Sequence, residues 1–117
     1  MQDRPGGATV QFPTLTIIES IKFQALVDLY LEESSFSEFK TFLANHPDAG
    51  DVIPGSGGVR KIRWARAGMG QRGGVRIIYF AQLHHGELVL LTIYAKVKFD
   101  NIPPNVAREM KEAYENP

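Results

Sequence analysis

A run of positive charge without carboxylates occupies the middle of this chain. From residue 52 to residue 86 there is no Asp or Glu, although the whole chain has 13 acidic and 13 basic residues and no net charge. A local concentration of cations attracts phosphate whatever the net charge of the protein. The segment therefore predicts contact with a phosphate-containing partner. Its basic residues are Arg60, Lys61, Arg63, Arg66, Arg72 and Arg76.

Two features distinguish this run from an ordinary charged surface. Surfaces usually mix charges of both signs, whereas this segment carries one sign only. Arg76 also stands in an otherwise apolar segment, where an unpaired charge is costly unless a polar or anionic group meets it. With Tyr94 and Lys96 at the end of a later apolar segment, these cations fit an RNA backbone with a base stacked nearby. A solvated sheet face is the alternative interpretation.

Two other motifs are better explained by local structure than by chemistry. Residues 68–73 match the G-x-G-x-x-G pattern, but these glycines lead into a β-branched run and not into the helix that a dinucleotide site requires. The adjacent His84 and His85 diverge on a turn, and no further ligand lies at a suitable spacing. We therefore expect a loop and a turn at these positions, and neither a metal nor a cofactor.

The first half of the chain predicts one strand and two helices. Residues 14–19 are β-branched and alternating, which favours a strand. Ser35 and Glu38 form an S-x-x-E capping box, so the second helix is expected to begin at Ser35 and to stop at His46-Pro47. The stripe of the first helix is Phe23, Leu26, Val27, Tyr30 and Leu31, and that of the second is Phe36, Phe39, Phe42 and Leu43.

The second half predicts three strands, and the first of them carries the candidate chemistry. Over residues 59–66, Ile62 and Trp64 alternate with Lys61 and Arg63, which places two apolar groups on one face and two cations on the other. Residues 75–81 are apolar on both faces apart from Arg76, which favours a central strand.

The third strand of this meander covers residues 87–95 and is followed by a terminal helix. Alternation places Val89, Leu91 and Ile93 on one face of the strand. The opposite face is expected to carry Leu88, Leu90, Thr92 and Tyr94. Residues 105–115 then predict the helix, with Val106, Met110 and Tyr114 facing inward.

This order of elements, β-α-α-β-β-β-α, predicts an α+β fold in a single domain. The domain is expected to cover residues 14–117, and residues 1–13 are expected to form a flexible arm because they contain Pro5, Gly6, Gly7 and Pro13. The sequence has neither an apolar run of membrane-spanning length nor a secretory signal, so we expect a cytoplasmic protein. It also lacks cysteine, which excludes disulfides and thiolate chemistry.

Three ordered blocks of the sequence resemble the HigB branch of the RelE/ParE toxin superfamily. The blocks are residues 50–63, residues 72–79, and residues 91–96 followed by Asp100-Asn101, and the resemblance extends over residues 14–115. It implies two helices packed on a small, mostly antiparallel sheet. It further implies a toxin that enters the ribosomal A site and cuts translated messenger RNA. The implied partner is a HigA-like helix-turn-helix antitoxin, which neutralises the toxin and represses the shared operon by binding operator DNA.

The resemblance also assigns residues to a cleavage reaction that uses no metal. Matched position by position, the catalytic residues are Arg76, Lys61, Arg63, Tyr94 and Lys96, and the expected RNA contacts are Arg60, Arg66, Arg72 and Tyr79. Such a reaction removes the 2′-hydroxyl proton, stabilises a pentacoordinate phosphate and protonates the 5′-oxygen. Lysine would act as the base and arginine as the electrostatic clamp, while an aromatic ring holds the splayed base.

Two other functions stay open at this point. The sister branch of the superfamily inhibits DNA gyrase without cutting RNA, and a fold alone does not decide between these activities. A plain RNA-binding module would show salt-dependent affinity without cleavage.

Overall fold

Helices and strands of the described residues assemble around one five-stranded sheet. The computed structural model describes residues 15–66, 70–95 and 101–117, without the side chains of residues 66 and 70–73. The elements are β2 (Thr16–Glu19), α1 (Ile21–Tyr30), α2 (Glu33–Asn45), β3 (Asp51–Val52), β4 (Arg60–Arg66), β5 (Gly70–Gln82), the 3-10 turn η1 (Leu83–His85), β6 (Glu87–Ala95) and α3 (Pro104–Glu115). The predicted fold class and element order are confirmed, with the short β3 as an addition. The expected arm, residues 1–13, lies outside the described residues.

The five strands form one sheet in the order β2-β6-β5-β4-β3. Strand β2 runs parallel to β6, and all other neighbours are antiparallel. Strand β5 is central, as its sequence predicts. It begins at Gly70 and pairs there with Arg66, so part of the expected glycine loop is strand instead. The pairing of β4 with β5 is irregular between Trp64 and Arg66, and this register shift accommodates the additional residues at the start of β5.

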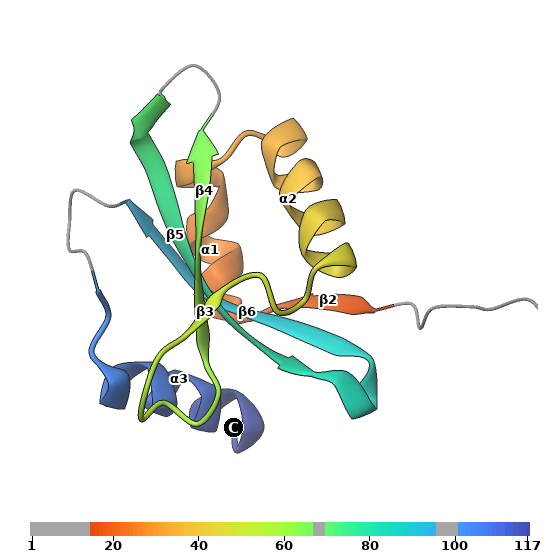
Figure 1. The fold of residues 1–117 in the computed structure, drawn as a ribbon, viewed down its shortest axis with the longest axis vertical. Helices are drawn as coiled ribbons and strands as arrows, with labels where there is room; N and C mark the ends of the chain where they lie inside the picture. Colours follow the sequence, from red (N-terminus) through yellow and green to blue (C-terminus); the bar gives the residue numbers. More distant parts are fainter. Residues whose placement is uncertain (1–14, 67–69, 96–100) are drawn as a thin grey trace, which may run out of the picture.

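Helices cover both faces of the sheet (Figure 1). Phe23 and Val27 of α1 and Phe39 and Leu43 of α2 join the buried residues of one face, which include Ile77. Helix α3 covers the other face, where its residues Val106, Met110 and Tyr114 pack beside the buried Ala107, as the sequence predicts. Residues 76, 78 and 80 of β5 belong to this α3 face, because side chains alternate along a strand.

The start of α2 differs from the expected capping box. The helix begins at Glu33 with Glu32 as its N-cap, and no side chain caps it. Ser35 is instead a buried residue of the first turn, and its Oγ lies 3.3 Å from the donating Trp64 Nε1. This contact uses the serine oxygen for the packing of α2 on β4, so the motif marks a tertiary contact rather than a helix start.

Strand β6 carries a bulge that changes the expected faces. Ile78 pairs with Thr92 and Tyr79 with Leu90, so Leu91 has no partner of its own on β5. One extra residue moves all following side chains to the opposite face. Ile93 therefore joins Leu88 and Leu90 on the α1 and α2 face, and its predicted grouping with Val89 and Leu91 is wrong. The predicted face of Tyr94 is wrong for the same reason, because Tyr94 packs on the α3 face.

Candidate nucleic-acid interface

The alternation of β4 places Lys61 and Arg63 on the α3 face of the sheet. Lys61 lies opposite Ile78 of β5, which belongs to the core of that face. Directly opposed residues on neighbouring strands share a face, and residues two apart on a strand share one as well. Ile62 packs into the other core with Trp64 beside it, as predicted. The sequence prediction of two cations on one face is therefore confirmed by the pairing.

A row of three predicted site residues crosses the sheet next to Lys61. Arg63 of β4 pairs with Arg76 of β5, and Arg76 pairs with Tyr94 of β6. Opposed Cα atoms of antiparallel strands lie about 4.5 to 5.5 Å apart, so these side chains are immediate neighbours. We call Arg63, Arg76 and Tyr94 the cross-strand row. Like charges directly opposite each other destabilise a sheet, and an anion bound between them would relieve the repulsion.

The members of the cross-strand row lie at different depths. Arg63 is exposed, whereas Arg76 and Tyr94 retain only 4% and 5% of their accessible surface. The Nε atom of Arg76 is buried and has no hydrogen-bond partner among the residues that the structure describes. An unpaired donor of this kind costs about 1 to 3 kcal/mol. Arg76 thus behaves as a buried cation behind the surface that Arg63 presents.

Lys61 is held by a residue to which the sequence assigned no role. Its Nζ donates a hydrogen bond to Oδ1 of Asn101, which lies just before α3. Both side chains line a pocket of about 280 Å³ at the β3 edge of the sheet, which we call the Lys61 pocket. The only sequence signal for Asn101 is its place in the last block that resembles the toxin family. A hydrogen bond between such distant positions could not be read from that signal.

Arg60 and Tyr79 lie on the other face of the sheet, where they hold a loop in place. They are cross-strand partners, and Tyr79 is fully buried in the core under α1 and α2. The Tyr79 hydroxyl accepts a hydrogen bond from the Gly50 N–H and donates one to the Pro47 carbonyl, both at 2.9 Å. Nη1 of Arg60 donates to the carbonyls of Gly50 at 2.6 Å and Asp48 at 3.1 Å. Tyr79 is buried and Arg60 is bonded to the loop, so neither residue is placed for the expected RNA contact, and neither belongs to the candidate site.

Removing the Tyr79 hydroxyl should lower stability and leave the cross-strand row intact. In Tyr79→Phe the buried Gly50 N–H loses its partner, which should lower the free energy of unfolding by about 1 to 3 kcal/mol. Urea unfolding followed by circular dichroism would measure this. Tyr30→Phe, a change in a half-buried tyrosine of α1, serves as control and should stay within about 0.5 kcal/mol. Equal effects of the two variants would contradict the structural role of Tyr79.

The same hydroxyl should make stability fall in strong base. Burial raises the pKa of Tyr79 above its ordinary value of 10.0, against the opposing effect of the hydrogen bond from Gly50. Above pH 10.0 the unfolded chain loses the phenol proton while the folded chain keeps it. The free energy of unfolding therefore decreases with rising pH until the pKa of the folded state is passed. In Tyr79→Phe this decrease should be smaller than in the wild type, which unfolding curves from pH 9 upward would show.

Three of the sequence-predicted residues cannot be placed. Lys96 lies outside the described residues, and so do the side chains of Arg66 and Arg72. Their roles stay predictions.

The described residues were also compared with the requirements of a metal site and of a membrane-spanning helix. The predicted turn is present as η1, but the rings of His84 and His85 do not diverge as expected and pack against each other, with centroids 4.0 Å apart. In the described ranges, no group of three or more His, Cys, Asp or Glu side chains is placed to hold a metal ion. None of the described helices has the length and apolar character needed to cross a membrane.

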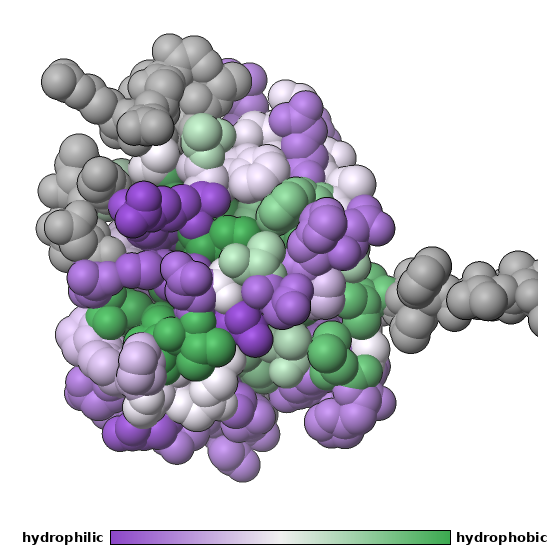
Figure 2. Space-filling view, viewed as in Figure 1, coloured by the Kyte–Doolittle hydropathy of each residue, from purple (hydrophilic) through white to green (hydrophobic). Residues whose placement is uncertain are grey.

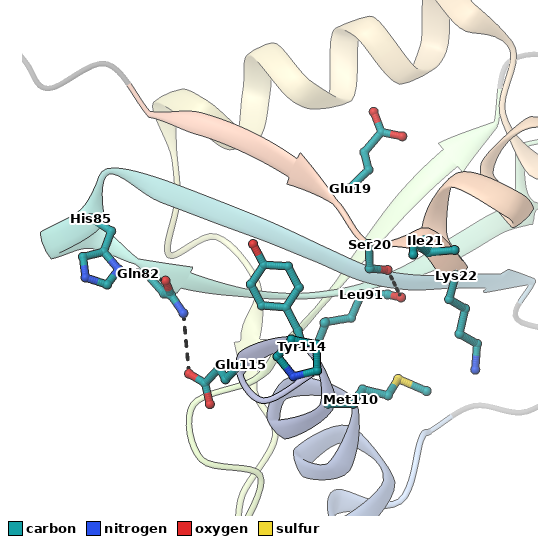
Figure 3. Close-up of a pocket in the computed structure, with 12 residues that line it drawn as sticks. Glu19, Ser20, Ile21, Lys22, Gln82, His85, Leu91, Met110, Tyr114 and Glu115 are labelled. Carbon is teal, nitrogen blue, oxygen red and sulfur yellow. Dashed lines mark hydrogen bonds between the residues drawn. The ribbon is translucent and has the colours of Figure 1, made fainter.

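A larger groove lies away from the cross-strand row (Figure 3). It has a volume of about 980 Å³ and runs between the C-terminal half of α3 and the junction of β2 with α1. Met110 and Tyr114 of α3 form one wall, and Ile21 of α1 lies on the other side. The described residues that line it include none of the predicted site residues. The groove is mainly apolar, and its side chains offer no constellation for catalysis.

Comparison with known proteins identifies the architecture. No family model matches the sequence. Among solved structures, a double-arginine mutant of the E. coli toxin RelE in the free state is similar, with a TM-score of 0.50. The chain has a RelE-like fold. The match covers 87% of this chain and 96% of the E. coli chain. At 13% sequence identity it concerns the course of the backbone, so the RelE-like fold is established separately from the activity.

Proposed function

We propose that this protein is the HigB-like toxin of a type II toxin–antitoxin pair and cleaves messenger RNA on the translating ribosome without a metal ion. The observation that carries this proposal is the alignment of Arg63, Arg76 and Tyr94 across three strands, with Lys61 two residues from Arg63. The RelE-like fold and the three sequence blocks support it. The site of action would be the cytoplasm, where ribosomes and messenger RNA are found.

The proposed chemistry distributes the steps of cleavage over these residues. Lys61, held by Asn101, removes the proton of the 2′-hydroxyl group, so that the 2′-oxygen attacks the phosphorus atom. Arg63 contacts the phosphate from the surface, and the charge of Arg76 behind it stabilises the pentacoordinate transition state. Tyr94 is 5% exposed, so it supports the neighbouring Arg76 from β6 instead of stacking on a base. This face thus supplies the general base and the positive charges that stabilise the transition state. The 5′-oxygen leaves with a proton from Lys96 or from water.

The proposed partners are the ribosome with its messenger RNA and a HigA-like antitoxin. The antitoxin would carry a helix-turn-helix domain, and the complex of toxin and antitoxin would bind operator DNA. An acidic antitoxin segment would complement the cations of residues 60–76. This part of the proposal rests on the sequence resemblance and on the RelE-like fold.

Primer extension on a reporter message in a reconstituted translation reaction tests the proposal. We expect cuts within the reading frame that require ribosomes and that decrease strongly with Arg63→Ala. Lys40→Ala, which removes a cation from α2 on the opposite side of the sheet, should cut like the wild type. An intact message with inhibited DNA supercoiling would overturn the proposal in favour of a gyrase inhibitor. RNA binding without cleavage would reduce the protein to a binding module.

A further inference from the structure

The Lys61 pocket lies beside the cross-strand row, on the same face of the sheet. Its walls are apolar, formed by Ile53 and Pro54 at one side and by Ile102 and Pro104 at the other. Figure 2 shows apolar surface bordered by hydrophilic residues where β3, β4 and the start of α3 meet in Figure 1. Pockets for drug-sized ligands measure about 300 to 1,000 Å³, so a pocket of about 280 Å³ suits a single ring system.

The wall between β3 and β4 is fixed by hydrogen bonds. The Ser56 hydroxyl donates to the Ile53 carbonyl at 2.5 Å and accepts from the Val59 N–H at 3.1 Å. Helix α3 holds the same loop from outside, because Arg108 donates to the Gly55 carbonyl and Lys111 to the Gly57 carbonyl. A wall fixed in this way loses little conformational freedom when a ligand binds. The pocket is therefore preorganised.

The polar groups of the pocket come from three elements and carry both donors and acceptors. Asp51 of β3 lies directly opposite Lys61 of β4, and both line the pocket. Asn101 lies at the end of the segment before α3 and accepts the hydrogen bond of Lys61 through its Oδ1. Its amide nitrogen supplies two further donor hydrogens, and the Asp51 carboxylate supplies acceptors. A small, mainly apolar pocket with these polar groups has the features of a site for a nucleobase.

We propose that the Lys61 pocket binds an RNA base that carries an exocyclic amino group, next to the phosphate held at the cross-strand row. This inference rests on the proposed function, because it assigns the pocket to the same RNA. Lys61 lines the pocket and lies two residues before Arg63 on β4, a separation of about 6.6 Å, so the pocket adjoins the row. The Asp51 carboxylate accepts from the amino group, as acidic side chains do from cytosine N4.

The chemistry predicts which base is rejected. Uracil offers a single ring donor, its N3–H, and has carbonyl oxygens where the other bases carry an amino group, so a base seated with that position against the Asp51 carboxylate leaves two acceptors opposed. Adenine, cytosine and guanine each offer an amino group. Asp51 is also a negative charge beside a cationic surface, which weakens phosphate affinity. A carboxylate in this place is thus better suited to selecting a base than to attracting the RNA backbone.

Binding measured without cleavage tests the pocket directly. The wild-type protein, labelled with ¹⁵N, is titrated with trinucleotides whose central base is A, C, G or U and whose sugars are 2′-deoxy to prevent cleavage. We expect shifts at the Val52 and Ile102 amides and at the Asn101 side-chain amide. The dissociation constant should be about five- to tenfold higher for the uracil probe than for the cytosine probe. Asp51→Asn should remove this difference, and Asp48→Asn, a matched exposed carboxylate in the loop below Tyr79, should keep it.

The outcomes separate this inference from the proposed function. Equal affinities for the four probes, or no shift at the pocket, would overturn the base assignment even if the protein cuts messages. Selective binding by a protein that cuts no message would retain the pocket and overturn the nuclease. Free 5′-monophosphates serve as a further arm, and tighter binding of these than of the trinucleotides would contradict a site for RNA.

Discussion

Replacing Arg76 by alanine should lower the rate of ribosome-dependent cleavage by a factor of about 50 to 10³. At an effective dielectric constant of about 20, two unit charges about 7 Å apart interact by about 2.4 kcal/mol, which corresponds to about 50-fold in rate. Loss of one preorganised donor at a developing charge costs about 10² to 10³. Arg76 is 4% exposed with an unpartnered Nε among the described residues, so its replacement by alanine removes a buried charge together with the packing of its aliphatic stem.

Two further variants separate charge from packing. Arg76→Met keeps most of the side-chain volume and removes the charge, so the free energy of unfolding should rise by about 1 kcal/mol or more. Its cleavage rate should equal that of Arg76→Ala. Arg76→Lys keeps the charge and should retain part of the activity. Stopped-flow or gel-based cleavage of a stalled ribosomal complex, paired with urea unfolding of each variant, gives both quantities.

The cleavage rate and the free energy of unfolding, measured on the same variants, distinguish a catalytic role of Arg76 from a structural one. A residue kept for the fold would lose stability on truncation, and a residue kept for the reaction would lose activity while stability stays or rises. If Arg76→Met cut messages at the wild-type rate, the cross-strand row would have no role in cleavage. If Arg76→Met were much less stable, the buried guanidinium would have to be counted as part of the core.

Only part of the row was accessible from sequence. Alternation correctly grouped Lys61 with Arg63 and placed Arg76 in a central strand. The register that aligns Arg63 with Arg76 and Tyr94 could not be derived from the sequence. A shift of the pairing by one residue would move every side chain of a strand to the opposite face of the sheet. The bulge at Leu91 shows this. It puts Ile93 on the α1 and α2 face and Tyr94 on the α3 face, the reverse of the expected faces, and nothing in a run of apolar residues marks it.

Depth and long-range contacts were also outside the reach of sequence. Arg60 and Tyr79 have residue types suited to RNA, yet the pairing places them on the face that α1 and α2 cover. The serine of the apparent capping box was used for Trp64 instead, because a tertiary partner outcompeted the helix terminus. Asn101 became a candidate only when the chain before α3 was seen beside β4.

Replacing Lys61 by arginine should reduce cleavage by about 10² to 10⁴ although the positive charge is kept. Arginine stays protonated in proteins and cannot accept the 2′-hydroxyl proton, whereas a lysine amine is able to. A positioned proton acceptor contributes about 10² to 10⁴ in rate. Lys61→Met should lose a similar factor, and Lys40→Arg, a matched change on α2, should cut at the wild-type rate.

A comparison of three variants decides between a base and a charge. With Lys61 as the base, Lys61→Arg and Lys61→Met should lose cleavage to a similar extent, because neither side chain can accept the 2′-hydroxyl proton. Asn101→Ala should cut more slowly than the wild type but faster than Lys61→Arg, because Lys61 keeps its amine and loses the acceptor that orients it. Wild-type activity in Lys61→Arg would make Lys61 a phosphate contact. The proton acceptor would then have to be Lys96 or another group, while the electrostatic role of the cross-strand row would stand unchanged.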